Sequence, residues 1–116
     1  MSQVREYPLE GVKVYELRVL PDDRVFAEAL RQDWSELLEG DWIVQANISY
    51  SYPGIIRAWH KHERGQIDYF LVLKGAIIER IDRLEESLIG KNAKLIKTGE
   101  RNAIKLHVEV HSELIL

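Results

Sequence analysis

Short runs of alternating hydrophobic and polar residues dominate the chain and predict β-strands. Residues 12–20 (VKVYELRVL) are rich in β-branched residues and end at Pro21-Asp22-Asp23, where the fixed proline φ and Asx hydrogen bonding favour a turn. Further strand-length runs follow at roughly regular spacing, broken by glycines: residues 55–62, 67–75, 76–84, 93–99 and 103–110. Short strands separated by turn signals are typical of β-sandwiches and barrels.

Two segments add detail to this pattern. Residues 29–40 (ALRQDWSELLEG) predict a short helix with Asp33 as its cap and Gly40 at its end. The apolar residues of this helix fall at helical spacing: Leu30, Trp34, Leu37 and Leu38. Residues 41–52 alternate as a strand, with an apolar side and a side that carries mostly amides and hydroxyls. Together the elements predict an all-β fold, a cupin-like jelly-roll barrel with one short helix, as a single domain over residues 1–116.

Composition and charge narrow the possible partners. A chain of 116 residues with 46% hydrophobic residues can bury one core, and the absence of cysteine favours an intracellular protein. The 16 Lys and Arg residues are scattered singly among 19 Asp and Glu residues, so no basic stripe predicts a nucleic-acid partner. No apolar run reaches the length of a signal peptide or a membrane span, so we expect a cytoplasmic protein with no membrane partner.

Chemically active side chains gather in the segment PGIIRAWHKHERGQID (residues 53–68), which contains Arg57, His60 and His62 inside a predicted strand. Three interpretations fit: a polar strand face, a metal site, or a catalytic base beside a substrate-binding arginine. Arg57 and His60 have opposite parity, so they can share one face only if a bulge near Trp59 shifts the strand.

Other polar positions fit either a ligand site or a solvated strand. Gln45 and Asn47 share one face of their strand, where amides can line an edge facing water or contact a ligand. Arg24, Phe26 and Glu28 alternate along an extended segment and offer a cation, an aromatic ring and a carboxylate. Such a set can stack a base and bind a phosphate, and it equally fits an exposed strand.

An ordered series of motifs resembles the dTDP-4-dehydrorhamnose 3,5-epimerase family, which has a cupin fold. The series is Asp22-Asp23-Arg24, Phe26-Ala27-Glu28, Arg31-x-Asp33-Trp34, Gln45-x-Asn47-x-Ser49, and PGIIRAWH followed by Gln66 and Lys74-Gly75. The resemblance implies a homodimeric isomerase that acts on a deoxythymidine-diphosphate (dTDP) sugar of rhamnose biosynthesis. It implies proton abstraction beside a 4-keto group, without a metal or other cofactor.

The resemblance also implies roles for individual residues. His60 is implied as the general base, which suits a side chain that titrates near neutral pH. Asp68 is implied at a catalytic position where the family has a lysine that stabilises the enolate. The residues implied to bind the nucleotide sugar are Arg24, Phe26, Glu28, Gln45, Asn47 and Arg57, the first three of them across a dimer interface.

The chain departs from the family at its C-terminal end, where the family's tyrosine acid and supporting aspartate are absent. We therefore expect a shortened, diverged relative whose epimerisation is impaired, or a sugar-nucleotide-binding protein without catalysis.

A metal site is the alternative interpretation. His60 and His62, two residues apart on one strand face, can both bind one ion, and Gln66 or Asp68 can join them from the next strand. His107 or His111 is then the expected fourth ligand. The sequence alone does not decide between this small metal-binding cupin and the epimerase.

Overall fold

The computed structural model describes most of the chain. The described residues are 4–6, 9, 11–17, 19–20, 26–27, 30–62, 65–82, 84–89, 94–98, 104–108 and 113–116. Within these ranges, no helix has the length and hydrophobicity that a membrane crossing requires.

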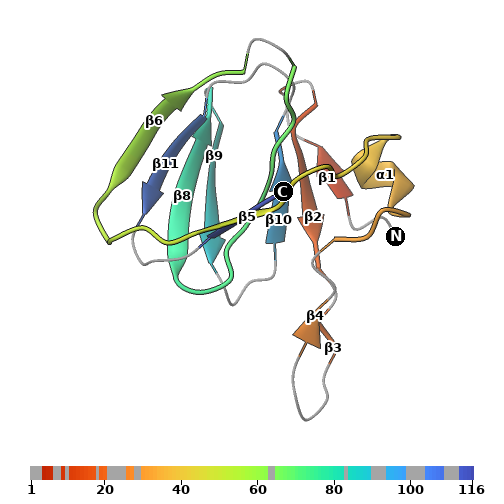
Figure 1. The fold of residues 1–116 in the computed structure, drawn as a ribbon, viewed down its shortest axis with the longest axis horizontal. Helices are drawn as coiled ribbons and strands as arrows, with labels where there is room; N and C mark the ends of the chain where they lie inside the picture. Colours follow the sequence, from red (N-terminus) through yellow and green to blue (C-terminus); the bar gives the residue numbers. More distant parts are fainter. Residues whose placement is uncertain are drawn as a thin grey trace.

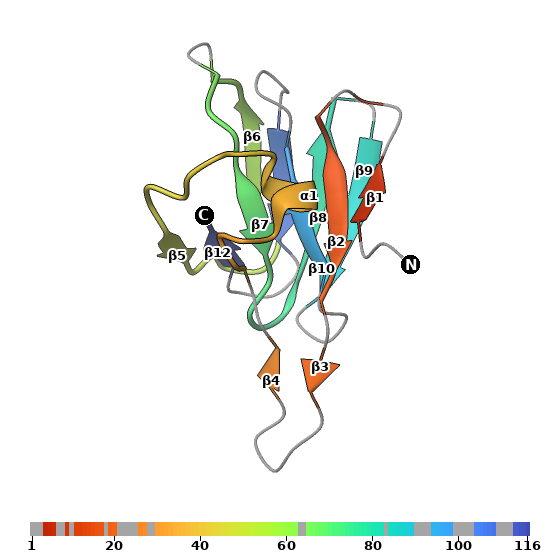
Figure 2. The same cartoon turned by 90° about the vertical axis from the view of Figure 1, so that its right-hand side faces the viewer.

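Two antiparallel sheets face each other and form the body of the fold (Figures 1 and 2). The six-stranded sheet has the order β1 (Val4–Glu6), β2 (Lys13–Glu16), β10 (Lys94–Lys97), β7 (Tyr69–Leu71), β12 (Glu113–Ile115) and β5 (Asn47–Ser49). The four-stranded sheet has the order β6 (Ile56–His60), β11 (Ile104–Val108), β8 (Ala76–Ile81) and β9 (Leu84–Ile89). Among the described strands, β3 (Val19–Leu20) and β4 (Phe26–Ala27) pair with each other alone and project away from the body. This arrangement confirms the predicted all-β, jelly-roll fold.

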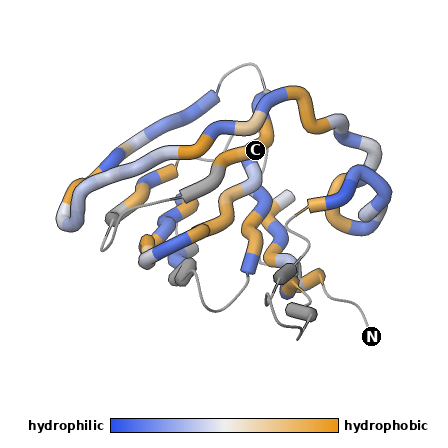
Figure 3. The backbone as a smooth tube through the Cα atoms, turned by 60° about the horizontal axis from the view of Figure 1, so that its bottom comes forward, coloured by the Kyte–Doolittle hydropathy of each residue, from blue (hydrophilic) through white to orange (hydrophobic). Residues whose placement is uncertain are grey.

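Strand alternation divides the buried residues between two apolar clusters. On β7, Phe70 points between the two sheets, whereas Tyr69 and Leu71 point toward α1 (Ser35–Leu38). The cluster between the sheets contains Val12, Val14, Phe70, Val72, Ile77, Ile81, Ile96, Ile104 and Leu106. The other contains Tyr15, Leu37, Leu38, Tyr69, Leu71 and Leu95. Figure 3 shows the matching alternation of hydrophobic and hydrophilic residues along the chain. Burial on both faces of β7 explains its continuous apolar run.

The helix is shorter than the predicted 29–40, because α1 covers only Ser35–Leu38. Trp34 is its N-cap residue and makes no side-chain capping bond, so the prediction of Asp33 as the cap was wrong. The Asp33 carboxylate instead binds the Arg31 guanidinium at 2.7 Å. Glu39 has a left-handed backbone (φ 52°) and ends the helix one residue before Gly40.

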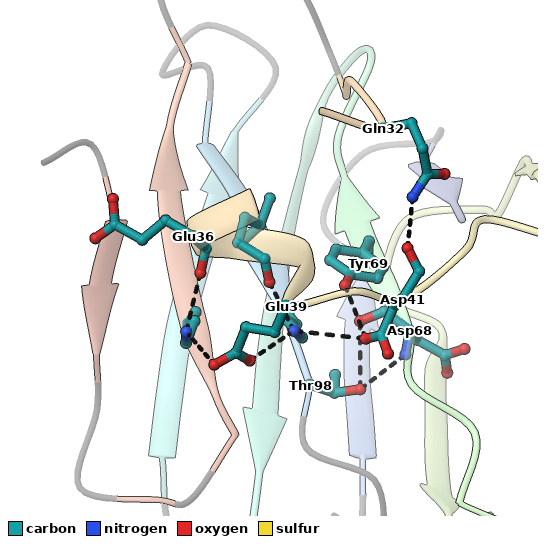
Figure 4. A network of polar contacts seen from close by, with 10 residues as sticks. Gln32, Glu36, Glu39, Asp41, Asp68, Tyr69 and Thr98 are labelled. Atoms are coloured by element: carbon teal, nitrogen blue, oxygen red, sulfur yellow. Dashed lines mark hydrogen bonds and ion pairs between the residues drawn. The ribbon is translucent and has the colours of Figure 1, made fainter. Parts of the chain in front are cut away.

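Two lysines from the sheet bind the carbonyl groups of this short helix (Figure 4). Lys97 Nζ donates to the Leu37 carbonyl at 2.6 Å, and Lys13 Nζ donates to the Glu36 carbonyl at 3.0 Å. Both ammonium groups also pair with the Glu39 carboxylate, at 3.0 and 2.8 Å. These bonds satisfy backbone groups that a helix of this length leaves without partners.

The segment predicted as a strand over residues 41–52 pairs only as β5, and its apolar side chains face outward. Trp42 is 78% exposed and Val44 is 92% exposed. Alternation was therefore a correct indicator of two faces, but the apolar face of this segment is not part of the core.

Candidate active site

A cavity of about 840 Å³ opens beside β6 and β7 and brings together most of the predicted site residues. Its apolar lining includes Phe70, Ile104 and Leu106 from the core between the sheets. The predicted site residues in its wall are Gln45, Asn47, Arg57, His60, His62, Gln66 and Asp68. They come from β5, β6 and the segment before β7, so residues distant in the sequence form one polar wall.

A bulge in β6 explains how Arg57 and His60 reach the same cavity. On the neighbouring strand β11, Leu106 pairs with Arg57 and Ile104 pairs with His60. Three steps along β6 therefore match two steps along β11, which is the signature of one extra residue in a strand. The predicted bulge near Trp59 is confirmed.

Serine hydroxyls hold the Arg57 side chain. Arg57 Nη2 donates to Ser49 Oγ at 2.6 Å and also to Ser51 Oγ. Arg57 is half-buried and Ser51 is buried, so these bonds fix the guanidinium at the cavity wall. Sequence reasoning missed Ser51, although Ser49 continues the alternation of Gln45 and Asn47.

His60 is exposed at the cavity, and no hydrogen bond or ion pair within the described ranges engages its imidazole. An unengaged imidazole can accept a proton from a bound molecule. Gln45 Nε2 donates to Asn47 Oδ1 at 3.2 Å, so the two predicted amides form one exposed pair.

Asp68 pairs with His62 and not with His60. His62 Nε2 lies 3.3 Å from Asp68 Oδ2, and Gln66 Nε2 donates to Asp68 Oδ1 at 2.7 Å. The backbone of Asp68 is fixed by Thr98, whose Oγ1 accepts from the Asp68 N–H at 3.0 Å (Figure 4). The sequence placed Asp68 at a catalytic position but did not indicate this partner.

Glu79, on β8, is a second buried carboxyl group that sequence reasoning missed. It is fully buried, and neither carboxyl oxygen has a hydrogen-bond partner among the described residues. Burial raises the pKa of Glu79 well above its usual range, and the charges of Asp68 and Glu86 raise it further. The buried site therefore favours the neutral form of this carboxyl group. Its only sequence signal is an acid within the apolar run AIIERI.

Further residues were also predicted to contribute to the site. Arg24, Glu28 and His111 are outside the described residues. Phe26 belongs to β4, in the projecting strand pair. The described part of the chain contains no group of three or more His, Cys, Asp or Glu residues arranged to hold a metal ion.

The two facing sheets and the cavity beside them define a cupin-type jelly roll. No protein-family model matches the chain. The "Probable low-salt glycan biosynthesis epimerase Agl13" of Haloferax volcanii is 36% identical over 99 residues, 81% of this chain and 60% of that protein. The "Spore coat polysaccharide biosynthesis protein SpsL" of Bacillus subtilis is 36% identical over 98 residues, 84% of this chain and 64% of that protein. The chain thus spans less than two thirds of either relative.

The solved dTDP-4-dehydrorhamnose 3,5-epimerase of Bacillus anthracis, which has TDP and PPi bound, has the same fold. It aligns with a TM-score of 0.81 at 24% identity, over 97% of this chain and 74% of the epimerase. The chain therefore shares its fold with solved members of the dTDP-4-dehydrorhamnose 3,5-epimerase family, in agreement with the resemblance that its motifs indicated.

Proposed function

We propose that the protein is a sugar-nucleotide epimerase or isomerase that removes a proton beside the 4-keto group of a dTDP sugar. The observation that carries this proposal is the shared cavity of His60 and Arg57, with a bulge that turns both side chains to it. The names of the two relatives and the TDP bound to the solved epimerase support the same class of substrate.

Four residues of the cavity wall have roles in this reaction: His60, Arg57, Gln45 and Asn47. The C–H bond beside a carbonyl is acidic, because its electron pair can move to the carbonyl oxygen, and His60 accepts the released proton. Arg57 is positioned by Ser49 and Ser51 to bind diphosphate oxygens in a bidentate manner. Gln45 and Asn47 bind the nucleotide end of the same ligand.

A homodimer is part of the proposal. Large apolar side chains stay exposed along the segment that includes β5 and β6: Trp42, Val44, Ile48, Tyr50, Tyr52, Ile56 and Trp59. Contiguous exposed apolar residues commonly mark an interface, and a second copy of the chain can cover them symmetrically.

Solvent exchange tests the reaction directly. A dTDP-4-keto-6-deoxy sugar is incubated with the protein in deuterium oxide, and NMR follows deuterium at the carbons beside the carbonyl. We expect exchange with the unmodified protein, none with His60→Asn, and no effect of a chelator. Lys61→Asn is the matched control, because Lys61 is exposed and does not line the cavity.

Two other outcomes have a clear meaning. Binding of the sugar nucleotide without any exchange would indicate a non-catalytic relative. Chelator-sensitive exchange, with equal losses in His60→Asn and His62→Asn, would support the metal site instead.

A further inference from the structure

The cavity contains a second group of polar side chains that the reaction at His60 does not use. The group consists of His62, Gln66 and Asp68, all of which line the same cavity as His60. Asp68 is only 7% exposed, whereas about a third (34%) of the His62 side chain remains accessible. A buried carboxylate therefore holds a histidine that a ligand can reach.

The contacts of His62 leave one ring nitrogen free for a ligand. Nε2 lies 3.3 Å from both the Asp68 carboxylate and the Gln66 amide nitrogen. When Nε2 carries a proton it donates to Asp68, and when it does not it accepts from Gln66. No described residue bonds Nδ1. A hydrogen on Nδ1 together with the Nε2–H bond to Asp68 requires the imidazolium form of His62, in which both ring nitrogens donate.

The surrounding charges support this arrangement. Burial raises the pKa of Glu79, on β8, well above its usual range, which disfavours a second negative charge near Asp68. Thr98, which directly follows β10, bonds the Asp68 backbone through two neutral groups, its hydroxyl and its backbone N–H. The other charged or titratable groups that face the cavity from β6 are Arg57 and His60.

We propose that His62 is the second catalytic residue, donating a hydrogen bond from Nδ1 to the sugar carbonyl oxygen, and that Asp68 is its positioning residue. This inference rests on the proposed function. His60 takes the proton from the carbon, and the electron pair of the broken C–H bond moves onto the carbonyl oxygen. The Nδ1–H group of His62 stabilises the negative charge on that oxygen. Return of a proton from His60 to carbon reverses both changes.

Substitutions that keep or remove an N–H donor test the role of His62. We expect His62→Leu to lower the solvent-exchange rate about 100-fold, the usual effect of losing one oxyanion donor. His62→Gln retains an amide N–H and should keep more activity than His62→Leu. Both variants should bind dTDP as tightly as the unmodified protein in calorimetry, so that the loss appears in kcat and not in KM.

Asp68→Ala tests positioning. It should lower kcat less than His62→Leu does, and it should add little to the loss when combined with His62→Leu, because the two residues act as a unit. Circular dichroism checks that each variant is folded.

The possible outcomes distinguish a wrong role for His62 from a wrong proposed function. Exchange at the unmodified rate in His62→Leu would overturn the role of His62 and leave the proposed function standing. Equal losses in His62→Gln and His62→Leu would also overturn it. No exchange by the unmodified protein would overturn the proposed function itself, and the role of His62 with it.

Discussion

Lys97 Nζ lies 2.6 Å from the carbonyl oxygen of Leu37, which joins the last turn of α1 to β10 across 60 residues of sequence. The ammonium group is buried, with Lys97 only 2% exposed, and it also approaches the carboxylates of Glu39 and Asp41. A four-residue helix is too short to be stable alone, so its position depends on such contacts.

Lys97→Met should therefore lower the free energy of unfolding by about 1.5–3 kcal/mol, the usual range for a hydrogen bond to a charged group. Urea denaturation measures this value. Arg31→Met is the control, because the Arg31–Asp33 pair is exposed and such pairs contribute about 0–1 kcal/mol. Similar effects of the two substitutions would contradict the role assigned to Lys97.

Glu79→Met should raise the free energy of unfolding above that of the unmodified protein by more at pH 8 than at pH 5. The pKa of Glu79 is raised in the folded state, so below the unfolded value of 4.5 the carboxyl is neutral in both states. As pH rises above that value, only the unfolded state loses the proton, and the stability of the unmodified protein falls. Methionine cannot titrate and fills a similar volume.

Urea denaturation of both proteins at the two pH values checks this prediction. A stability difference that does not change with pH would mean that Glu79 ionises in the folded protein.

Arg57→Ala should weaken dTDP binding about 10-fold or more, as expected for loss of a charged hydrogen bond to the ligand. Ser51→Ala should weaken it less, because Ser51 only orients the guanidinium. Calorimetric titration measures both constants. Equal affinity in Arg57→Ala and the unmodified protein would place the diphosphate elsewhere.

Tyr52→Glu should convert the proposed homodimer into a monomer. Tyr52 is 80% exposed, so the charge costs little in the monomer, but it becomes costly once a partner covers it. Light scattering at micromolar concentration reports the mass. Lys74→Glu is an exposed control outside the apolar segment. A monomeric unmodified protein would contradict the homodimer.

The sequence was informative where a local pattern determines the structure. The parity of Arg57 and His60 was sufficient to predict a bulge, because side chains alternate strictly along a regular strand. The apolar periodicity of residues 29–40 correctly marked Leu37 and Leu38 as buried, but it could not reveal that only one turn is helical. Before Trp34, the Gln32 side chain instead bonds to the backbone of Asp41 and Ile43.

Pairings between distant residues could not be predicted from the sequence. Asp68 pairs with His62 and not with His60, and its backbone is bonded to Thr98, 30 residues away. Glu79 looked like one more polar residue of a strand, whereas it lies on the core-facing side of β8 with Ile77 and Ile81 and is completely buried. A cytoplasmic location, the choice of sugar and the contacts of Arg24, Phe26 and Glu28 stay predictions.

The bulge in β6 also changes how spacing should be counted when this site is sought in other chains. Arg57 and His60 are three residues apart, yet their partners on β11 are two residues apart. Ala58 and Trp59 therefore stand together opposite a single residue of β11. Deleting Ala58 would leave a regular strand in which the arginine and the histidine still share a face. Relatives with an R-x-H spacing can therefore have the same cavity wall as this chain, and alignments that penalise the missing residue would overlook them.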